Sequence, residues 1–232
     1  MHNATYGVAL CIFEEAIVGR TRGIRTEITG APLRTVRPIM LEHVYANPRR
    51  ELVHMRDAGL LVQIAPGTYT AKPDGIPPGH RWRPGLEEAA MAYATAQYAD
   101  RVPVLYGLGA ARFHHAIPRA IGVTVIAVPE QHRAVTMTDG GRVVFTTTDV
   151  TRLAARYERT DLGGFLVTTP EQTLLDLLDR PGLGGMPQQA NVAARAFAAR
   201  VDLGRAQEMA AGRTRTLRHK LEKLIQETEG ER

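Results

Sequence analysis

The segment from Asn47 to Ala71 constrains the fold more than any other part of the sequence. Asn47 is a favourable N-cap residue, and Pro48 suits the first position of a helix, where a missing amide hydrogen costs nothing. Leu52 begins an apolar face, most other positions are basic or polar, and Gly59 supplies the C-terminal stop. This pattern predicts a short basic helix.

A tight β-hairpin follows this helix in the sequence. Residues 60–64 are β-prone, Pro66 and Gly67 occupy the positions that a type II turn prefers, and residues 68–71 form the return strand. A basic helix with a hairpin directly behind it is how a winged helix-turn-helix docks on DNA. An ordinary helix-hairpin corner of an α+β domain has the same pattern, so the shape alone leaves both interpretations open.

The residues before Asn47 are expected to complete such a domain. Residues 6–18 have the spacing of a first helix, and Thr35 to Ala46 is predicted to be the helix that positions the basic one. Arg34 and Arg37 would then lie at the N-terminal end of the positioning helix, near a DNA backbone.

Length and charge agree with a DNA-binding half. The chain has 232 residues, of which 44% are hydrophobic, so it is long enough for two domains. Its formal net charge of +5 permits nucleic acid as a partner. Residues 1–84 hold 11 Lys or Arg against 7 Asp or Glu, whereas residues 85–232 hold 18 against 17. The excess positive charge therefore accompanies the helix and hairpin.

The sequence indicates a cytoplasmic protein without a membrane span. No apolar run approaches the roughly 18 residues that a span needs, and the segment from Met1 to Val18 carries Glu14 and Glu15 instead of a basic start and a cleavage site. Cys11 is the only cysteine, which excludes an internal disulfide and disfavours a thiolate metal cluster.

A linker rich in proline and glycine, residues 72–84, divides the chain into a winged helix-turn-helix domain at 1–80 and a second domain at 81–232. The second domain is expected to be a mixed α/β domain that ends in a helical segment, so the fold class is α+β. Its expected helices span residues 85–98, 107–115, 169–178, 188–200, 203–211 and 213–227, and its expected strands span residues 102–106, 123–128, 134–137, 143–147 and 165–168.

Two of these helices carry distinctive patterns. Thr169 and Gln172 have the spacing of a capping box, and Pro170 occupies the first helical position. The last helix has an apolar stripe surrounded by basic residues, which either form a solvated face or bind an acidic partner or phosphate. The candidate contact residues for a partner are Arg213, Arg215, Arg218 and Lys220.

Four motifs together resemble a known family. They are GLL…APGTY in the predicted hairpin, then YGLGAARFHHAI, VTVIAVPEQHR and TTPEQTLLDLLDRPGLGG. In this order the chain resembles the AbiEi family of antitoxins, over nearly its whole length from Thr35 to Glu227. The resemblance implies a DNA-binding winged helix joined to a C-terminal antitoxin domain, with a nucleotidyltransferase-like toxin of the AbiEii type as partner.

The resemblance also implies how each domain acts. The first domain would bind repeats in the promoter of its own operon and repress it by occlusion, with Arg49, Arg50, His54 and Arg56 facing the groove and Lys72 or the hairpin tip touching phosphates. The second domain would neutralise the toxin by masking it, by acting on the target of the toxin, or by modifying the toxin covalently. Only the covalent route requires a cofactor, namely ATP with Mg²⁺.

The covalent route would make the chain an enzyme, and the sequence contains no recognisable catalytic motif. Serine is absent from the sequence, and Cys11 lacks a neighbouring base, which disfavours either nucleophile. His114 and His115 diverge if they lie on a helix, and the turn at Gly107 lacks the third glycine of a dinucleotide fingerprint.

Asp176 and Asp179, one helical turn apart, have the spacing to hold Mg²⁺, although polar positions on a capped helix are the simpler interpretation. Transfer of a phosphoryl group to the toxin is therefore the alternative function. A third hypothesis is a stand-alone winged-helix regulator that senses a small ligand through its second domain.

Overall fold

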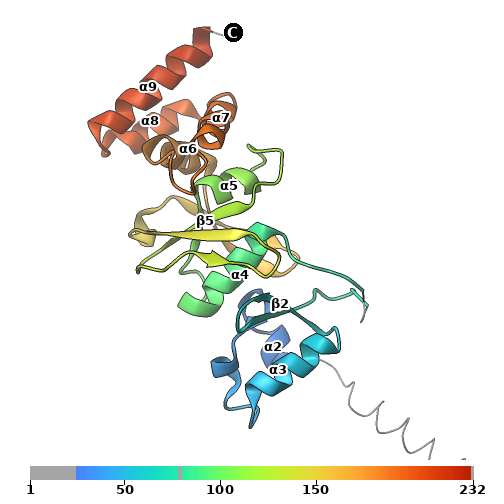
Figure 1. Cartoon of the computed structure of the whole chain (residues 1–232). Coiled ribbons are helices and arrows are strands. Elements are labelled where there is room, and N and C mark those ends of the chain that lie inside the picture. The colour runs from blue at the N-terminus through green and yellow to red at the C-terminus, as the bar shows by residue number, and fades with distance from the viewer. Residues whose placement is uncertain (1–24, 78–79, 231–232) are drawn as a thin grey trace, which may run out of the picture.

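The computed structural model describes residues 25–77 and 80–230, which form an elongated molecule of stacked layers (Figure 1). A small sheet with helix α3 (Pro48–Asp57) lies at one end, followed by α4 (Leu86–Tyr98) and a larger sheet. The C-terminal helices cover the opposite face of the larger sheet. The helix expected at residues 6–18 and Cys11 lie outside the described residues.

The small sheet contains three antiparallel strands in the order β1-β3-β2. The hairpin of β2 and β3 follows α3 as expected, and Gly67 at its tip has a φ of 68°, which favours glycine. The third strand, β1, comes from before α3 and pairs with β3. The elements of this part are α2 (Thr26–Thr29), the 3₁₀ turn η1 (Pro32–Arg34), β1 (Thr35–Val36), the 3₁₀ turn η2 (Pro38–Leu41), α3, β2 (Leu61–Ala65) and β3 (Thr68–Ala71).

The helix predicted from Thr35 to Ala46 is wrong. Thr35 pairs with Thr70 in the sheet, and the two hydroxyls lie 2.8 Å apart. Arg37 has an extended backbone, with φ −115° and ψ 155°, because the ring of Pro38 disfavours a helical conformation in the preceding residue. Only the short 3₁₀ turn η2 remains of the expected helix.

The larger sheet is mixed and has six strands in the order β6-β7-β5-β4-β9-β8. Two neighbouring pairs, β5 with β7 and β4 with β9, are parallel, and the other pairs are antiparallel. The strands are β4 (Val104–Tyr106), β5 (Val123–Val128), β6 (Val135–Thr136), β7 (Arg142–Thr147), β8 (Ala155–Thr160) and β9 (Gly163–Thr168). The strand segments left a mixed or an antiparallel sheet open, and the two parallel pairs make the sheet mixed.

Strand β5 is buried on both faces, which accounts for its continuous apolar sequence. Val123, Val125 and Ala127 belong to the core under the C-terminal helices, whereas Ile126 and Val128 belong to the core under α4. Successive side chains of a strand point to opposite faces, so one strand serves both cores.

The second half ends in helices, as the sequence predicts. They are α6 (Pro170–Asp179), α7 (Pro187–Ala198), α8 (Leu203–Ala211) and α9 (Arg215–Gly230). Earlier in this half, α5 (Gly107–Phe113) lies between β4 and β5, and the 3₁₀ turn η3 (Val150–Arg152) lies between β7 and β8. Thr169 caps α6 by accepting a hydrogen bond from the amide of Gln172 at 3.3 Å. Among the described residues, none of the helices combines the length and the apolar character that a bilayer span requires.

The sequence did not indicate strand β8. Its residues, ARYERT, are largely exposed and polar, because β8 is an edge strand that pairs only with β9. Neither a buried run nor a clear alternation marks such a strand.

The small sheet and the larger sheet share a hydrophobic core. Leu33, Ile64 and Ala65 lie in the same buried cluster as α4 and the side chains of Ile126 and Phe165. The amide of Thr138 also donates to the carbonyl of Ile64 at 2.9 Å. The predicted boundary at residue 80 therefore lies between two sheets that share one core, with α4 packed between them.

Candidate functional site

The first candidate site is the exposed basic side of α3. Asn47 caps the helix by accepting a hydrogen bond from the amide of Arg50 at 3.2 Å, and Leu52 is fully buried on the opposite side. Arg49, Arg50 and His54 are exposed, and none of their side chains has a hydrogen-bond or ion-pair partner among the described residues. These three residues are called the α3 surface below. Helical spacing places Arg50 and His54 opposite the buried Leu52, and Arg49 is exposed in the first turn of the helix.

The other basic residues that the sequence assigned to DNA lie in different environments. Arg34 makes two hydrogen bonds to Asp74, at 2.9 and 3.2 Å, so its guanidinium is already engaged. Arg37 is only partly exposed, and its charge partly offsets the raised pKa that burial gives Tyr93 of α4. The structure does not bring these two arginines to the α3 surface.

Arg56 and Lys72 are also engaged in contacts within the chain. Arg56 donates to Asp57 at 2.8 and 2.9 Å and to Gln63 at 2.9 Å. Lys72 is only 9% exposed, and its ammonium donates to the carbonyl of His80 at 2.6 Å. Lys72 is therefore not an exposed phosphate contact. Arg56 differs from Arg49 and Arg50 because its guanidinium already has partners within the chain.

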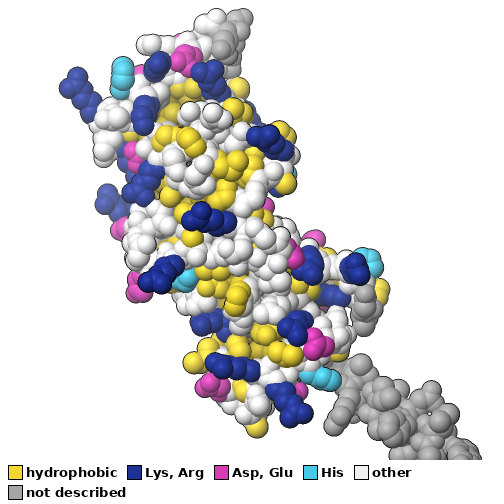
Figure 2. All heavy atoms as spheres, in the orientation of Figure 1, with side chains coloured by type: hydrophobic (Ala, Val, Ile, Leu, Met, Phe, Trp, Pro, Cys, Tyr) yellow, Lys and Arg dark blue, Asp and Glu magenta, His cyan; other side chains and the backbone are white. Residues whose placement is uncertain are grey.

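Positive charge is distributed rather than concentrated on the face that Figure 2 shows. Lys and Arg side chains are interspersed with single acidic ones from the end with α3 to the end with α9. The number of basic residues therefore does not locate an anion-binding site on this molecule. Such a site is indicated by the cations that lack a carboxylate partner.

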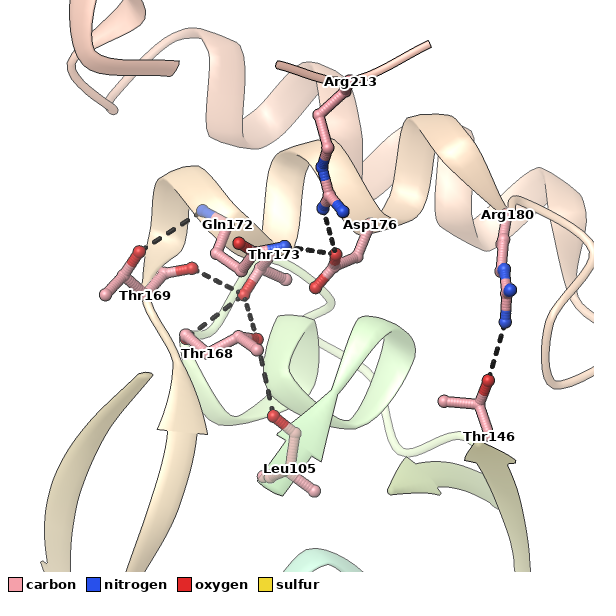
Figure 3. Close-up of polar contacts among 9 residues, drawn as sticks. All are labelled: Leu105, Thr146, Thr168, Thr169, Gln172, Thr173, Asp176, Arg180 and Arg213. Carbon is pink, nitrogen blue, oxygen red and sulfur yellow. Dashed lines mark hydrogen bonds and ion pairs between the residues drawn. The ribbon is translucent and has the colours of Figure 1, made fainter. Parts of the chain in front are cut away.

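The second candidate site is a buried polar cluster on α6 (Figure 3). The carboxyl of Asp176 accepts a hydrogen bond from the side-chain amide of Gln172 at 2.6 Å, and a guanidinium nitrogen of Arg213 lies 3.8 Å from the same oxygen. Arg213 reaches it from the segment between α8 and α9. The other oxygen of Asp176 is buried without a hydrogen-bond partner among the described residues. Asp176, Gln172 and Arg213 are called the Asp176 cluster below.

Burial dominates the electrostatics of this cluster. Burial raises the pKa of Asp176 from 3.8 to about 8, and the hydrogen bond from Gln172, the nearby hydroxyl of Tyr106 and the charge of Arg213 oppose this shift only in part. Burial also raises the pKa of Tyr106, and the neighbouring Asp176 adds to that effect. Asp176 is therefore a neutral acid near pH 7, which is the kind of perturbed carboxyl that occurs at functional sites and in buried structural networks alike.

Asp176 and Asp179 do not form a pair. Asp176 is buried against α5 and the sheet, whereas Asp179 is exposed at the end of α6. One carboxyl is buried and the other lies in solvent, so the two do not surround a common Mg²⁺ site. No group of three or more possible His, Cys, Asp or Glu ligands occurs in residues 25–77 and 80–230.

The glycine turn before α5 has a packing role. A Cβ atom on Gly109 would lie 2.4 Å from the hydroxyl of Thr124 and 2.7 Å from Leu105, so only glycine lets α5 approach β5 this closely. Residues 107–111 are buried. A phosphate cradle at this turn has no support from these contacts.

The paired histidines also separate. His114 is partly buried, with its ring 2.8 Å from the carbonyl of Thr168 and edge-on to Phe113 and Phe197. His115 is exposed, with a φ of 58°. His114 thus joins the end of α5 to β9 and α7.

The basic residues proposed for partner contact divide in the same way. Arg215 and Arg218 on α9 are exposed. Lys220 is partly buried and donates to the carbonyl of Leu178 at 2.9 Å, and Arg213 belongs to the Asp176 cluster. Sequence reasoning missed Tyr106 as a neighbour of Asp176, because 70 positions separate them and only the fold brings them together.

No family model matches the sequence, and no curated protein matches it either. Among solved structures, the chain is similar to the crystal structure of the RV2827C protein from Mycobacterium tuberculosis, with a TM-score of 0.57 and 18% sequence identity. The similarity covers 92% of this chain and 75% of that chain. At this identity the comparison establishes a shared fold, and it extends across both sheets.

Proposed function

We propose that this chain is an antitoxin that represses its own operon by binding promoter DNA and that neutralises a nucleotidyltransferase-like toxin. The observation that carries the proposal is the α3 surface, in which the side chains of Arg49, Arg50 and His54 are exposed directly before a hairpin and pair with no carboxylate of the described residues. The order of motifs that resembles the AbiEi family supplies the antitoxin role.

The arrangement of the small sheet supports a winged helix. A strand from before the helix completes a three-stranded sheet with the hairpin that follows it, as in winged-helix domains. In such domains the helix enters the major groove and the hairpin lies against the backbone. The exposed tip at Pro66 and Gly67 is free to make that second contact.

The chemistry of the α3 surface suits DNA. Arginine side chains pair with phosphate oxygens and with the acceptor edge of guanine, and they keep their charge at every physiological pH. Arg49 and Arg50 lie in the first turn of α3, the end of a recognition helix that usually contacts bases. We therefore place both in the interface and leave out of it Arg34 and Arg56, which pair with carboxylates, and Lys72, which is buried.

Operator binding is tested with the double variant Arg49→Ala, Arg50→Ala. Its affinity for a duplex from the promoter of its own operon is expected to fall roughly tenfold or more, and the slope of log affinity against log salt should shrink by about 2, because two phosphate-neutralising charges are lost. Gel-shift titrations at several salt concentrations measure both quantities.

Arg156→Ala with Arg159→Ala is the matched control. It removes the same charge from exposed positions of β8, which lies in the larger sheet. Equal losses in the two double variants would mean that only net charge matters and would reject α3 as the recognition helix.

Toxin neutralisation is assigned to the second half, where Arg215 and Arg218 are exposed on α9 and suit an acidic surface. The alternative is a catalytic antitoxin that transfers a phosphoryl group from ATP to the toxin, and the perturbed Asp176 beside Arg213 is the observation that favours it.

Intact mass spectrometry of the mixed proteins separates these two routes. The full chain is mixed with the neighbouring toxin, with and without ATP and Mg²⁺, and complex formation is recorded together with the masses. A stable complex with unchanged toxin mass supports masking. A toxin mass raised by one phosphate only when the antitoxin is present supports catalysis, and Asp176→Asn should then abolish the mass change.

A further inference from the structure

A basic cleft lies at the junction between the hairpin and the linker. It has a volume of about 590 Å³ and is bounded by the C-terminal end of α3, strand β2 and residues 80–83. Strand β2 lies at the edge of the small sheet as the described residues form it, and Thr138, which donates to Ile64 of this strand, also lines the cleft. In Figure 2, Lys and Arg side chains gather on the projection where Figure 1 draws the linker.

The lining of this cleft is one-sided in charge. Arg56, Lys72, Arg81 and Arg83 line it, and none of the described residues that line it is acidic. Two of the four cations have carboxylate partners next to the cleft, because Arg56 pairs with Asp57 and Arg83 contacts Asp139. Arg81 and Lys72 have no carboxylate within ion-pair distance among the described residues, so the cleft keeps an uncompensated positive charge.

Lys72 is the most informative of these cations. Its side chain is only 9% exposed, and the only hydrogen bond of its ammonium within the described chain goes to the carbonyl of His80. A lysine ammonium has three donors, so two remain for other partners. Burying a cation without a counter-charge is costly, and an anion in the cleft would offset that cost.

Trp82 adds an aromatic surface to the same wall. It is partly buried, packs against the core cluster that contains Ile64, and lines the cleft. Indole rings stack on nucleobases. Many proteins hold nucleotides without sequence preference by stacking a base on an aromatic ring while nearby cations contact the phosphate. The cleft volume also falls within the range of small-molecule sites.

We infer that the basic cleft binds a nucleotide unit, with its phosphate between Lys72 and Arg81 and its base against Trp82. The phosphate comes either from a free nucleotide or from a nucleic-acid strand. Both ligands would be bound by the same contacts, namely cations to the phosphate and the indole ring to the base. This binding is separate from operator recognition by the α3 surface.

The fluorescence of Trp82 tests the inference directly, because it is the only tryptophan of the chain. The full chain is titrated separately with AMP, ATP, inorganic phosphate and an oligothymidylate strand. Saturable quenching by AMP or ATP, reversed by inorganic phosphate, identifies a free nucleotide as ligand. Saturable quenching by the oligothymidylate alone identifies a strand as the source of the phosphate.

Two variants locate the binding. Lys72→Met keeps the buried stem of the side chain and removes its charge, and Arg81→Gln removes the exposed charge; each should weaken the ligand that quenches Trp82 by roughly tenfold. Arg205→Gln, an exposed arginine on α8, is the matched control and should bind normally. Absence of saturable quenching by every probe, or unchanged affinity in both folded cleft variants, would overturn the inference.

The double variant Arg49→Ala, Arg50→Ala separates this site from the proposed function. Its Trp82 response should equal that of the unmodified chain even where operator binding is lost. If the unmodified chain binds no operator and still shows the Trp82 response, the nucleotide site stands and the proposed function fails. Loss of the response in the double variant would instead contradict a separate site.

Discussion

Asp176 shows how one residue is defined by its surroundings. A carboxyl on an exposed helix face ionises near pH 4, but here burial raises its pKa to about 8 despite Gln172 and Arg213. One oxygen of the neutral acid accepts a hydrogen bond from the side-chain amide of Gln172. Arg213 lies 3.8 Å from the same oxygen, beyond hydrogen-bond distance. The residue thus retains a proton that the unfolded chain would release at neutral pH.

The pH dependence of stability follows from this difference. Because the folded pKa lies above the unfolded one, the protonated Asp176 favours folding fully below pH 3.8, and this contribution is lost as the pH rises to about 8. Asp176→Asn cannot ionise, so its free energy of unfolding should lack a component that falls by up to about 1.4 kcal/mol per pH unit. Urea denaturation at several pH values measures the difference.

Asp179→Asn, at an exposed position of the same helix, is the control and should follow the unmodified chain. If Asp176→Asn showed the same pH slope as the unmodified chain, the carboxyl would be ionised in the folded protein.

At the scale of elements, the packing of α5 on β5 depends on a glycine in α5, because a larger residue would leave too little space between the helix and the strand. Gly109 places the helix backbone where a Cβ atom would be 3.0 Å from the carbonyl of Val125 and closer still to Thr124 and Leu105. This contact aligns α5 with both α6 and β9, the elements that hold Asp176 and Thr168. The geometry of the Asp176 cluster therefore depends on a glycine outside it.

Gly109→Ala is expected to destabilise the protein by about 1–3 kcal/mol, because the added methyl group forces neighbouring atoms to move in a packed core. Thermal or urea unfolding measures the loss. Gly182→Ala is the matched control, because its Cβ position is open and its φ is not positive. A loss no larger than in the control would show that α5 can shift away from β5 freely.

Across the whole molecule, the two sheets behave as one packed body. Ile64 of the small sheet lies in the core cluster of α4, and its carbonyl accepts a hydrogen bond from Thr138 of the larger sheet's loop. A fragment that begins after the linker would expose this apolar surface of α4. The roles of the two halves are therefore better tested with point variants of the full chain than with fragments.

Ile64→Ala should lower the stability of both halves together, by about 2–5 kcal/mol, because the cavity lies in their common core. Calorimetry should show one transition that moves to lower temperature. Ile39→Ala is the control, because Ile39 is 64% exposed. Two separate transitions, with only the first one shifted, would show that the sheets unfold independently.

The sequence by itself determined the elements whose causes are local. The cap at Asn47, the turn at Gly67 and the cap at Thr169 each depend on residues within a few positions, and the two-faced burial of β5 follows from its own apolar run. The exposure of Arg50 and His54 was predicted for the same reason, since helical spacing puts them on the side of α3 away from Leu52, and Arg49 is exposed in the first turn.

Only the tertiary structure decided the features that depend on distant partners. It replaced a predicted helix by β1, because Thr35 pairs with Thr70, and it buried Lys72 against the linker. It also placed Arg213 beside Asp176 and formed the basic cleft between α3, β2 and Trp82. Burial and charge pairing are properties of the space around a side chain, and residues far apart in the sequence supply that space.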